Sequence, residues 1–482
     1  MIDAAIRAKY TATIGIECHV QLKTQTKLFS AVGNDAREAP PNTLVSHIDF
    51  GMPGALPVLN KEAVHLAAKA GFALGSAPQP FSKFDRKHYF YPDLPMGYQI
   101  TQFDEPIVLG GSVEVMVSGN PVTIGITRAH LEADAGKSTH PAGTDYSLVD
   151  LNRAGTPLLE IVSEPDMHTA AEAKAYAHEL YLRMRYADVS EANLYYGNMR
   201  FDVNVSVSTT NELGVRTETK NINSFKAVER VVEYEINRQI TALEDGEVIV
   251  QETRGWDDAA LKTISQRTKE NADDYRYMPD PDLPPVVLSE EYIASVKAEM
   301  PPLPDDYRAV LRELAIDAQT VEDIVAVPYT AMTVKRIHEA AGSAHAKRVA
   351  FWLLQPISDD GTDESIAVSP IVPDEQYINL SQLVEDGKLS STAAKEVLAE
   401  LQTNGGDAQT IAEAKNLIQE SDEGAIAAIV ADVLAANPKA AEDVRAGEMK
   451  AIGFLTGQVM KASLGKANPA LAQQLIKRQL DV

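Results

Sequence analysis

The stretch Ile14-Gly15-Ile16-Glu17-Cys18-His19-Val20-Gln21-Leu22 alternates apolar and polar side chains along most of its length. Because successive side chains of a β-strand point to opposite faces, this period of two predicts a strand. Glu17, His19 and Gln21 then share one face, while the apolar residues, including Cys18, take the face that packs on a core. The segment therefore marks both a central strand of the fold and a candidate site.

The same alternation recurs in several other segments. Their polar positions are Asp202, Asn204 and Ser206; Arg128, His130 and Glu132; Arg216, Glu218 and Lys220; and Glu160 with Glu164. Any one of them alone is most simply a strand of an antiparallel sheet with one face in water. Solvated faces usually mix Thr, Lys, Glu and Arg, however, whereas these favour carboxylates, an amide and histidine. Together they predict a concave sheet that holds magnesium and a nucleotide, since Mg²⁺ prefers oxygen ligands and phosphoryl transfer needs a metal to neutralise charge.

Residues 1–290 consist mainly of strand-like segments separated by turns rich in Gly and Pro. Few helices among many strands predict an α+β domain with a largely antiparallel sheet. Residues 291–404 have the pattern of an all-α domain, and residues 405–482 that of an Ala-rich helical tail. A length of 482 residues agrees with about three domains.

Three helices are expected within the first of these domains. One covers residues 60–74, with Asn60 as its cap and Gly75 after its end. A second follows Thr169. The third begins at Ser224 and closes at Gly246.

Two loops carry further candidates. The segment from Asp85 to Gln99 brings three basic side chains next to three tyrosines, which could bind phosphate and stack on a base, or could be a surface loop with buried aromatics. The segment from Asp273 to Asp282 sets four aspartates around Arg276, either at a pocket rim or as a cap on the domain. Ordinary phosphate loops, dinucleotide fingerprints and nucleophile elbows are missing from the sequence.

The composition narrows the class of protein. The single cysteine, Cys18, excludes internal disulfides and a zinc site built from several thiolates, and we read it as a small core residue. The sequence has neither an apolar signal segment nor an uncharged run of about 18 residues, so we expect a cytoplasmic protein without a membrane span. The net charge of −25 argues against general affinity for nucleic acid. The last 32 residues reverse the sign, since four basic residues stand against Asp481 alone.

Several blocks of the chain, in order, resemble the B subunit of the bacterial aspartyl/glutamyl-tRNA amidotransferases, the GatB family. The blocks that carry the resemblance are Ile14–Leu22, Asp85–Gln102, His130–Ser138, Asp150–Ile161, Gly197–Ser206, Glu218–Phe225, Gln251–Arg254, Asp274–Tyr277, Gly457–Ser463 and Gly465–Pro469. The resemblance implies a catalytic cradle similar in fold to glutamine synthetase and guanidino kinases, followed by a helical domain and a YqeY-like tail that recognises tRNA.

The same resemblance implies an activity and partners. GatB proteins use ATP and magnesium to phosphorylate the side-chain carboxylate of Glu-tRNA(Gln) or Asp-tRNA(Asn). Ammonia from the amidase (A) subunit then displaces the phosphate, and a small (C) subunit is the third member of the heterotrimer. Two rivals stay open: a free-standing ligase acting on a small carboxylate, and a noncatalytic tRNA-binding scaffold. Whether one or both tRNAs are used depends on the synthetases of the organism.

Roles for individual residues follow from the resemblance together with the strand pattern. The expected magnesium neighbours are Glu17, His19, Glu132 and Glu218, with Asp202 and Asn204 as further ligands or supporting residues. Lys87, Arg200 and Lys220 are expected to meet phosphate or developing charge. Tyr89, Tyr91 and Arg276 are expected to line the nucleotide or acyl-end pocket. The expected tRNA contacts are weak and salt-sensitive, and they involve Lys461, Lys466, Lys477 and Arg478 in the tail and the segment Lys83–Lys87.

One departure from part of the family concerns zinc. Many members carry four cysteines near the N-terminus that bind a structural zinc ion. The corresponding positions here are Ser30, Val32, Ser46 and Asp49. Because tetrahedral zinc needs thiolate or imidazole ligands, we expect no zinc at these positions.

Overall fold

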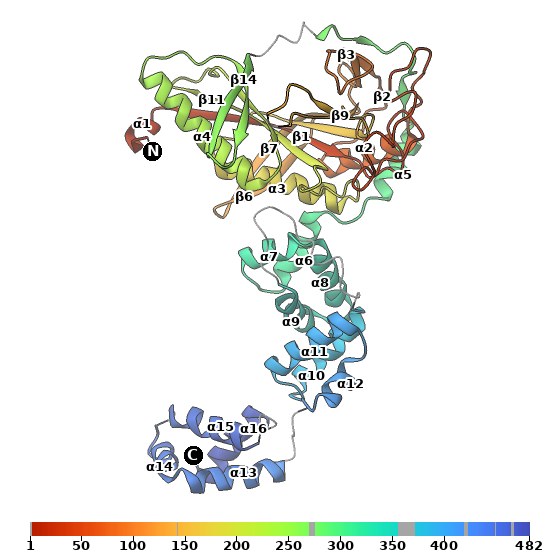
Figure 1. Ribbon diagram of the computed structural model, residues 1–482. Coiled ribbons are helices and arrows are strands. Elements are labelled where there is room, and N and C mark those ends of the chain that lie inside the picture. The colour runs from red at the N-terminus through yellow and green to blue at the C-terminus, as the bar shows by residue number, and fades with distance from the viewer. Residues whose placement is uncertain are drawn as a thin grey trace. The chain divides into compact units, whose positions relative to one another are not determined.

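The computed structural model describes residues 2–141, 143–268, 275–354, 372–418, 423–448, 450–463 and 467–482. The chain forms two compact units (Figure 1). One is built from Met1–Asp306, and the other begins at Tyr307. The first contains the sheet, and the second consists of helices.

A twelve-stranded sheet forms the first unit. Its main path runs β14-β13-β12-β11-β1-β10-β7-β4-β3-β15. The strands, in that order, are Lys262–Thr268, Glu252–Asp257, Thr217–Ile222, Met199–Ser208, Thr11–Gln21, Pro157–Ser163, Asn120–Ala133, Tyr98–Thr101, Asp85–His88 and Met278–Pro279. β5 (Val108–Leu109) and β6 (Ser112–Val117) also pair with β7.

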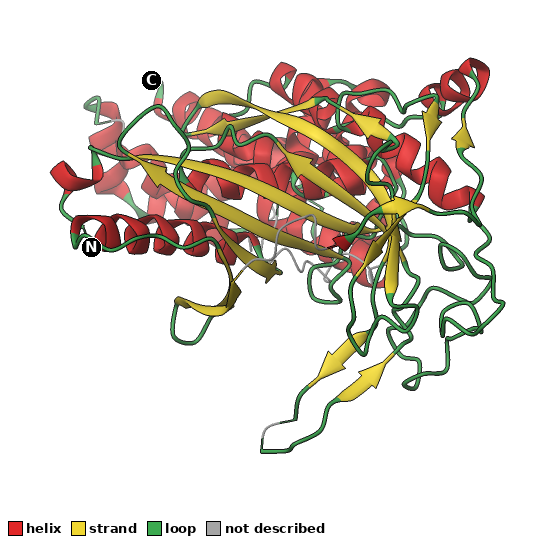
Figure 2. Cartoon of the chain, turned by 90° about the horizontal axis from the view of Figure 1, so that it is seen from above, coloured by secondary structure: helices red, strands yellow, loops and turns green. Residues whose placement is uncertain are grey.

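All neighbours in this sheet are antiparallel except β12 and β13, which are parallel. The prediction of a largely antiparallel sheet is thereby confirmed. Figure 2 shows its long strands running side by side. Two small ribbons lie outside the sheet, one of β2 (Phe81–Ser82) with β16 (Val286–Val287) and the other of β8 (Lys137–Thr139) with β9 (Leu148–Asp150).

The strand β1 lies at the centre of the sheet, between β10 and β11. Its apolar side chains Ile14, Ile16, Cys18 and Val20 are all buried, as the alternation predicted. Helices α3 (Ala170–Tyr186) and α4 (Phe225–Glu244) pack on each other and on β1 and β11, and they cover this apolar face (Figure 1). The polar face of the same strands is left to form a site.

The three helices expected in this unit are present, and Asn60 and Ser224 cap two of them as expected. α2 (Lys61–Ala73) is capped by Asn60, whose side chain accepts a hydrogen bond from Glu62 N. Thr169 forms a capping box with Glu172 at the start of α3. Ser224 caps α4, and the chain turns at Gly246 with φ +78°. Two short helices, α1 (Ala4–Arg7) and α5 (Glu290–Ala298), complete the unit.

The second unit is helical. Its helices are α6 (Pro304–Glu313), which begins in the first unit, α7 (Ala318–Val325), α8 (Pro328–Ala341), α9 (Ser343–Leu353), α10 (Asp374–Glu385), α11 (Ser391–Asn404), α12 (Ala408–Ala414), α13 (Glu423–Ala436), α14 (Pro438–Arg445), α15 (Lys450–Ala462) and α16 (Pro469–Leu480). The last four share a core of their own, which includes Val430, Leu455 and Ile476. The domain limits at residues 290 and 404 stay predictions.

No single helix in the described ranges is long and apolar enough to cross a membrane. Helices α13 and α14 pass the same test only as a pair, and that pair is bent by 100°.

Candidate active site

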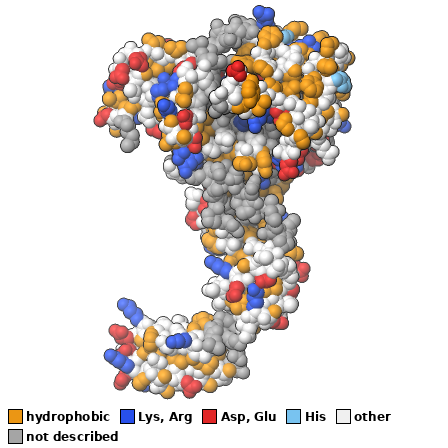
Figure 3. Space-filling view, viewed as in Figure 1, with side chains coloured by type: hydrophobic (Ala, Val, Ile, Leu, Met, Phe, Trp, Pro, Cys, Tyr) orange, Lys and Arg blue, Asp and Glu red, His pale blue; other side chains and the backbone are white. Residues whose placement is uncertain are grey.

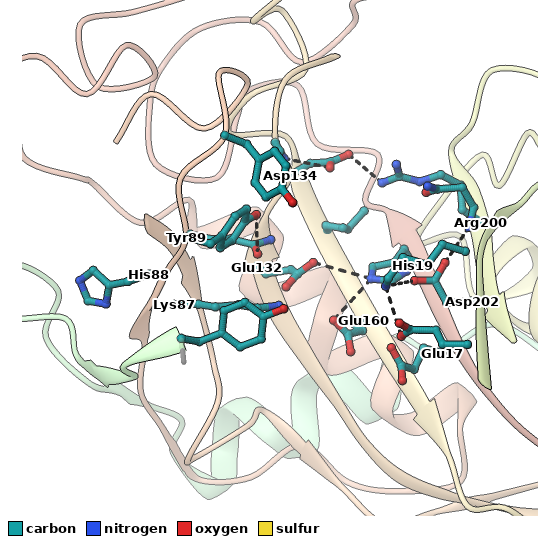
Figure 4. Close-up of a pocket in the computed structure, with 18 of the residues that line it drawn as sticks. Glu17, His19, Lys87, His88, Tyr89, Glu132, Asp134, Glu160, Arg200 and Asp202 are labelled. Carbon is teal, nitrogen blue, oxygen red and sulfur yellow. Dashed lines mark hydrogen bonds and ion pairs between the residues drawn. The ribbon is translucent and has the colours of Figure 1, made fainter. Parts of the chain in front are cut away.

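A pocket of about 860 Å³ opens on the polar face of the sheet. Side chains from β1, β3, β7, β10, β11 and β12 line it, together with the segment 275–278 (Figure 4). Eleven of the twelve residues expected at the catalytic and nucleotide sites lie on its wall: Glu17, His19, Lys87, Tyr89, Tyr91, Glu132, Arg200, Asp202, Glu218, Lys220 and Arg276. The twelfth, Asn204, donates a hydrogen bond to Glu17 Oε1 at 3.1 Å.

The register of the strands explains why these residues meet. His19 on β1 stands opposite Glu160 on β10 and opposite Arg200 on β11. Glu17 stands opposite Asp202 in the same way. Directly opposed side chains on one face lie about 5 Å apart at their Cβ atoms, so these pairs place functional groups from different strands next to one another.

The acidic groups form two clusters, in each of which one ligand atom per residue lies within 4.8 Å of the others. The first cluster consists of His19, Glu132 and Glu160, with His19 Nε2 at 3.4 Å from Glu160 Oε2 and 3.9 Å from Glu132 Oε1. The second consists of Glu17, Asp202 and Glu218. The first set offers two carboxylates and an imidazole and the second offers three carboxylates, donors that a divalent cation binds.

Cations face both clusters. Lys220 Nζ donates to Asp202 Oδ2 at 2.7 Å and lies 3.3 Å from Glu218 Oε1. Lys87 Nζ lies 5.0 Å from the ring centre of Tyr275 and 5.9 Å from that of Tyr89, a cation–π arrangement. Arg200 Nη2 donates to Asp134 Oδ2 at 3.0 Å, which holds the guanidinium at the pocket wall.

Burial and charge shift the pKa values of the first cluster strongly. Burial alone would lower the pKa of His19, but its hydrogen bond with Glu160 and the charges of Glu160, Asp202 and Glu132 raise it to about 9. Burial, reinforced by the charge of Glu160, raises the pKa of Glu132 to about 7. Burial lowers the pKa of His130 to about 4, so that this imidazole is neutral. Such displaced values are typical of functional sites.

The lysines of the pocket stay charged. Burial opposes the charge of Lys220, but Asp202 and Glu218 outweigh it and raise its pKa. For Lys87 burial is likewise outweighed, chiefly by Glu132, and its pKa is raised too. The pocket therefore combines carboxylates with permanent cations, which suits a substrate that carries several phosphate charges.

The site also contains residues to which the sequence pattern assigned no role. Glu160 joins the first cluster, although the pattern gives it only a place on a polar strand face. Asp134 follows Glu132 by the strand period of two, and this is the signal that could have found it. Gln99 accepts a hydrogen bond from Tyr89 OH at 3.2 Å and so fixes that ring. Tyr275 is paired with Lys87, and nothing in its loop sequence indicates this.

Three expectations of the strand pattern were wrong. Arg216 lies just before β12, is exposed, and does not line the pocket with Glu218 and Lys220. Glu164 does not share the pocket face with Glu160, because the pairing of β10 with β7 shifts between Val162 and Ser163 and the strand ends there. Its carboxylate accepts instead from Thr127 Oγ1 at 2.8 Å. Arg128 also lies outside the pocket, where its guanidinium donates to the carbonyl oxygen of Phe103.

Three of the four positions at which no zinc was expected, Ser30, Ser46 and Asp49, are joined by polar contacts. Ser30 Oγ lies 3.1 Å from Asp49 Oδ2, and Ser46 N donates to the same oxygen at 2.8 Å. The carboxylate of Asp49 also lies 3.5 Å from the ammonium of Lys27, whose side chain has no exposed surface. Val32 contributes only its backbone: its carbonyl oxygen accepts a hydrogen bond from Lys27 N.

Of the four residues expected to bind tRNA, Lys461 lies on α15 and both Lys477 and Arg478 lie on α16, all with exposed side chains. Lys466 lies outside the described residues, as do Asp273 and Asp274. Arg478 Nη1 donates to Glu423 Oε1 at 2.7 Å. Basic and acidic side chains are both present on this part of the surface (Figure 3).

Two family models match this chain. Residues 12–294 match the GatB/GatE catalytic domain, and residues 336–480 match the GatB domain. The chain belongs to the GatB family. The resemblance inferred from the motifs is thereby confirmed, and the catalytic-domain match takes in every residue that lines the pocket.

Relatives match this GatB chain over nearly its whole length. A protein of Synechococcus sp. (strain JA-3-3Ab) is 44% identical over 493 residues, covering 100% of this chain and 99% of the relative. One from Alkalilimnicola ehrlichii is 46% identical, covering 98% and 100%. One from Trichodesmium erythraeum is 45% identical, covering 99% of both. All three are named as the B subunit of aspartyl/glutamyl-tRNA(Asn/Gln) amidotransferase.

Proposed function

We propose that this chain is the ATP-dependent subunit of a glutamine-dependent tRNA amidotransferase. It would phosphorylate the side-chain carboxylate of Glu-tRNA(Gln), Asp-tRNA(Asn) or both, and the acyl phosphate would then react with ammonia to give the amide. The observation that carries the proposal is a single pocket in which two carboxylate clusters face Lys87 and Lys220. The names of the relatives point to the same reaction.

The chemistry needs two anions to meet, since a carboxylate oxygen must attack the γ-phosphorus of ATP while ADP leaves. The substrate carboxylate and the triphosphate repel each other when they come within bonding distance. A buried site of low polarity strengthens this repulsion, but it equally strengthens the attraction of both anions to nearby lysines. Lys87 and Lys220 keep their charge in the pocket and would hold the phosphates and the substrate carboxylate together. Ammonia would then attack the acyl carbon, with phosphate as the leaving group.

The two clusters fit magnesium by their donor sets. Glu17, Asp202 and Glu218 offer only oxygens, which this ion prefers, while His19, Glu132 and Glu160 add one imidazole. When bound, the metal would neutralise the triphosphate and the charge that develops during transfer. We assign Asn204 to the positioning of Glu17, because its amide donates to that carboxylate.

We further propose the assembly in which this chain works. Its partners would be an amidase (A) subunit, which supplies ammonia, and a small (C) subunit, in the cytoplasm. The cradle would share its fold with glutamine synthetase and guanidino kinases. The tail, through Lys461, Lys477 and Arg478, would contribute to tRNA binding. No zinc is needed to hold the loop around Asp49, because Lys27, Ser30 and Ser46 satisfy its carboxylate.

The decisive experiment uses Glu132→Gln in the reconstituted three-subunit enzyme. It removes one carboxylate of the first cluster with little change of shape, so tRNA-stimulated ATP hydrolysis should be lost while tRNA binding is retained. The matched control is Glu164→Gln, directly after β10 and outside the pocket, which should hydrolyse ATP normally. Unchanged ATP turnover by Glu132→Gln would refute the site and leave a tRNA-binding scaffold. Amide formation by the isolated chain, on a free amino acid, would favour the free-standing ligase.

A further inference from the structure

An exposed aromatic side chain stands at the mouth of the pocket. Phe90 lines the pocket, yet 84% of its surface is exposed. The next residue, Tyr91, is also pocket-lining and 50% exposed. Two adjacent aromatic side chains exposed at the edge of a polar site form an apolar patch that a ligand can cover.

Hydrogen bonds fix the neighbours of Phe90 in the chain, although little covers its ring. Tyr89, directly before it, is fixed by its hydrogen bond to Gln99. After it, Leu94 N bonds Tyr91 O and Gly97 N bonds Leu94 O, which closes a compact turn. A Cβ atom at Gly97 would lie 3.3 Å from Phe90 Cε1, so the ring rests against the backbone of that glycine. Gly97 has φ +73°, a conformation that other residues adopt only at a cost.

A rigid flat ring of this kind fits a nucleobase. Aromatic side chains bind unpaired bases by stacking, without regard to sequence. Both substrates of the proposed reaction carry an adenine: ATP, and the 3′-terminal adenosine to which the amino acid of an aminoacyl-tRNA is esterified. The shared chemistry is therefore adenine stacking, and the position of the ring decides between the two sources.

The position favours the tRNA. A small ligand such as ATP is expected to bury most of its surface in its site, whereas Phe90 faces outward. The terminal adenosine must lie at the mouth, because its esterified amino acid enters the pocket while the rest of the tRNA stays outside. Phe90 is three residues from Lys87, a Cα separation of at most about 11 Å. One ribose and one esterified amino acid would thus span the distance from the Phe90 ring to the charged groups around Lys87.

We propose that Phe90 is the stacking platform for the 3′-terminal adenine of the aminoacyl-tRNA. The assignment rests on the function proposed above and adds to it a site for one defined base. It makes Phe90 a substrate-positioning residue, distinct from the groups that meet ATP.

The test is a double-mutant cycle in the complete three-subunit enzyme. The dissociation constant is measured for wild type and Phe90→Ala, each with tRNA that carries or lacks its terminal adenosine. The Phe90→Ala enzyme should bind the full tRNA about 5- to 100-fold more weakly, the range expected for one stacked base. It should bind the truncated tRNA like wild type, because the partner of the ring is then missing. The KM for ATP should not change.

Variants at the same position separate stacking from bulk. Phe90→Tyr should retain binding, whereas Phe90→Leu, which is apolar but not flat, should lose most of it. Phe81→Ala, at an exposed phenylalanine on β2, is the matched control and should bind tRNA normally. An equal loss of affinity for both tRNAs would overturn the proposal, as would a raised KM for ATP with unchanged tRNA binding or a failure to assemble with the other subunits. The function itself is tested separately by Glu132→Gln, so the two failures are distinguishable.

Discussion

The buried pair of Lys27 and Asp49 lets one stability prediction be worked out in detail. The Lys27 side chain has no exposed surface, and its ammonium donates to the carbonyl oxygen of Leu44 at 2.6 Å and lies 3.5 Å from Asp49. Asp49 accepts in addition from Ser30 and from the backbone of Ser46. The change Asp49→Asn keeps the shape and removes the only carboxylate in contact with the buried ammonium among the described residues.

The size of the effect follows from this geometry. A buried charge left without its partner costs about 3–5 kcal/mol of unfolding free energy. This loss of unfolding free energy has an upper limit, because Lys27 can release its proton and become neutral instead. From an ordinary lysine pKa near 10.4, neutralisation at pH 7 costs about 4–5 kcal/mol, and burial already lowers the pKa of Lys27. We therefore expect about 3–4 kcal/mol for Asp49→Asn, near the lower end of these figures.

Two measurements on the full chain test this value. Denaturant unfolding should show a lower midpoint for the transition of the first unit, while that of the second stays in place. Hydrogen exchange should show faster exchange of the amides of Ser46, Ile48 and Asp49, which are bonded within this loop. The double variant Lys27→Met/Asp49→Asn should recover much of the loss, because a neutral pair needs no buried counter-charge.

The control is Lys83→Met, which breaks the partly exposed pair of Lys83 and Asp104. Such surface pairs contribute about 0–1 kcal/mol. If Asp49→Asn costs no more than this control, or if the double variant is less stable than the single, the buried pair is not what holds the loop.

Three further predictions concern the pocket and the tail. The raised pKa of His19, about 9 against an ordinary value near 6.5, means that its charge stabilises the metal-free fold below pH 6.5 and that this contribution is lost as the pH rises through 9. Magnesium must displace that proton, so the affinity for magnesium should increase with pH up to about 9. Calorimetry in buffers of different ionisation enthalpy would measure the proton release. Equal proton release by His19→Gln would contradict the assignment. Lys220→Met should strengthen Mn²⁺ binding at the second cluster several-fold, because in the wild type the Lys220 ammonium already neutralises Asp202 and competes with a metal ion. Weaker Mn²⁺ binding would mean that Lys220 supports the metal instead. The double variant Lys461→Gln/Lys477→Gln should weaken tRNA binding and reduce the slope of log K against log salt by about 1–2; filter binding at several salt concentrations measures it, and an unchanged slope would remove the tail from the tRNA site.

Much of the local structure could be predicted because it depends on neighbours in the chain. Asn60, Thr169 and Ser224 satisfy amide groups within four residues of themselves, so the starts of α2, α3 and α4 were visible in the sequence. The apolar face of β1 was visible for the same reason, since the period of two is a property of one strand.

The composition of the candidate site was only partly visible. The motifs and the polar strand faces identified eleven residues that the structure places on one wall. They gave Glu160 a polar strand face but no role, and they were wrong about Glu164, Arg128 and Arg216. Strand pairing decides two of these positions. The pairing of β1 with β10 places Glu160 beside His19, and the register shift after Val162 in the pairing of β10 with β7 removes Glu164 from the same face. A strand period says which side chains share a face, but not where an irregularity ends it.

The sequence by itself determined the family, the strand faces, the helix caps and the residue types available for phosphate chemistry. Tertiary structure alone decided how these groups are divided into two clusters, that Lys220 neutralises one of them, and that Lys27 and Asp49 form a buried pair. The physical reason is distance along the chain. Helix caps and strand periods are local, whereas Glu17 meets Asp202 and Glu218 only when strands about 200 residues apart in sequence become neighbours in one sheet. Their pKa values then follow from that burial and proximity, which no single segment contains.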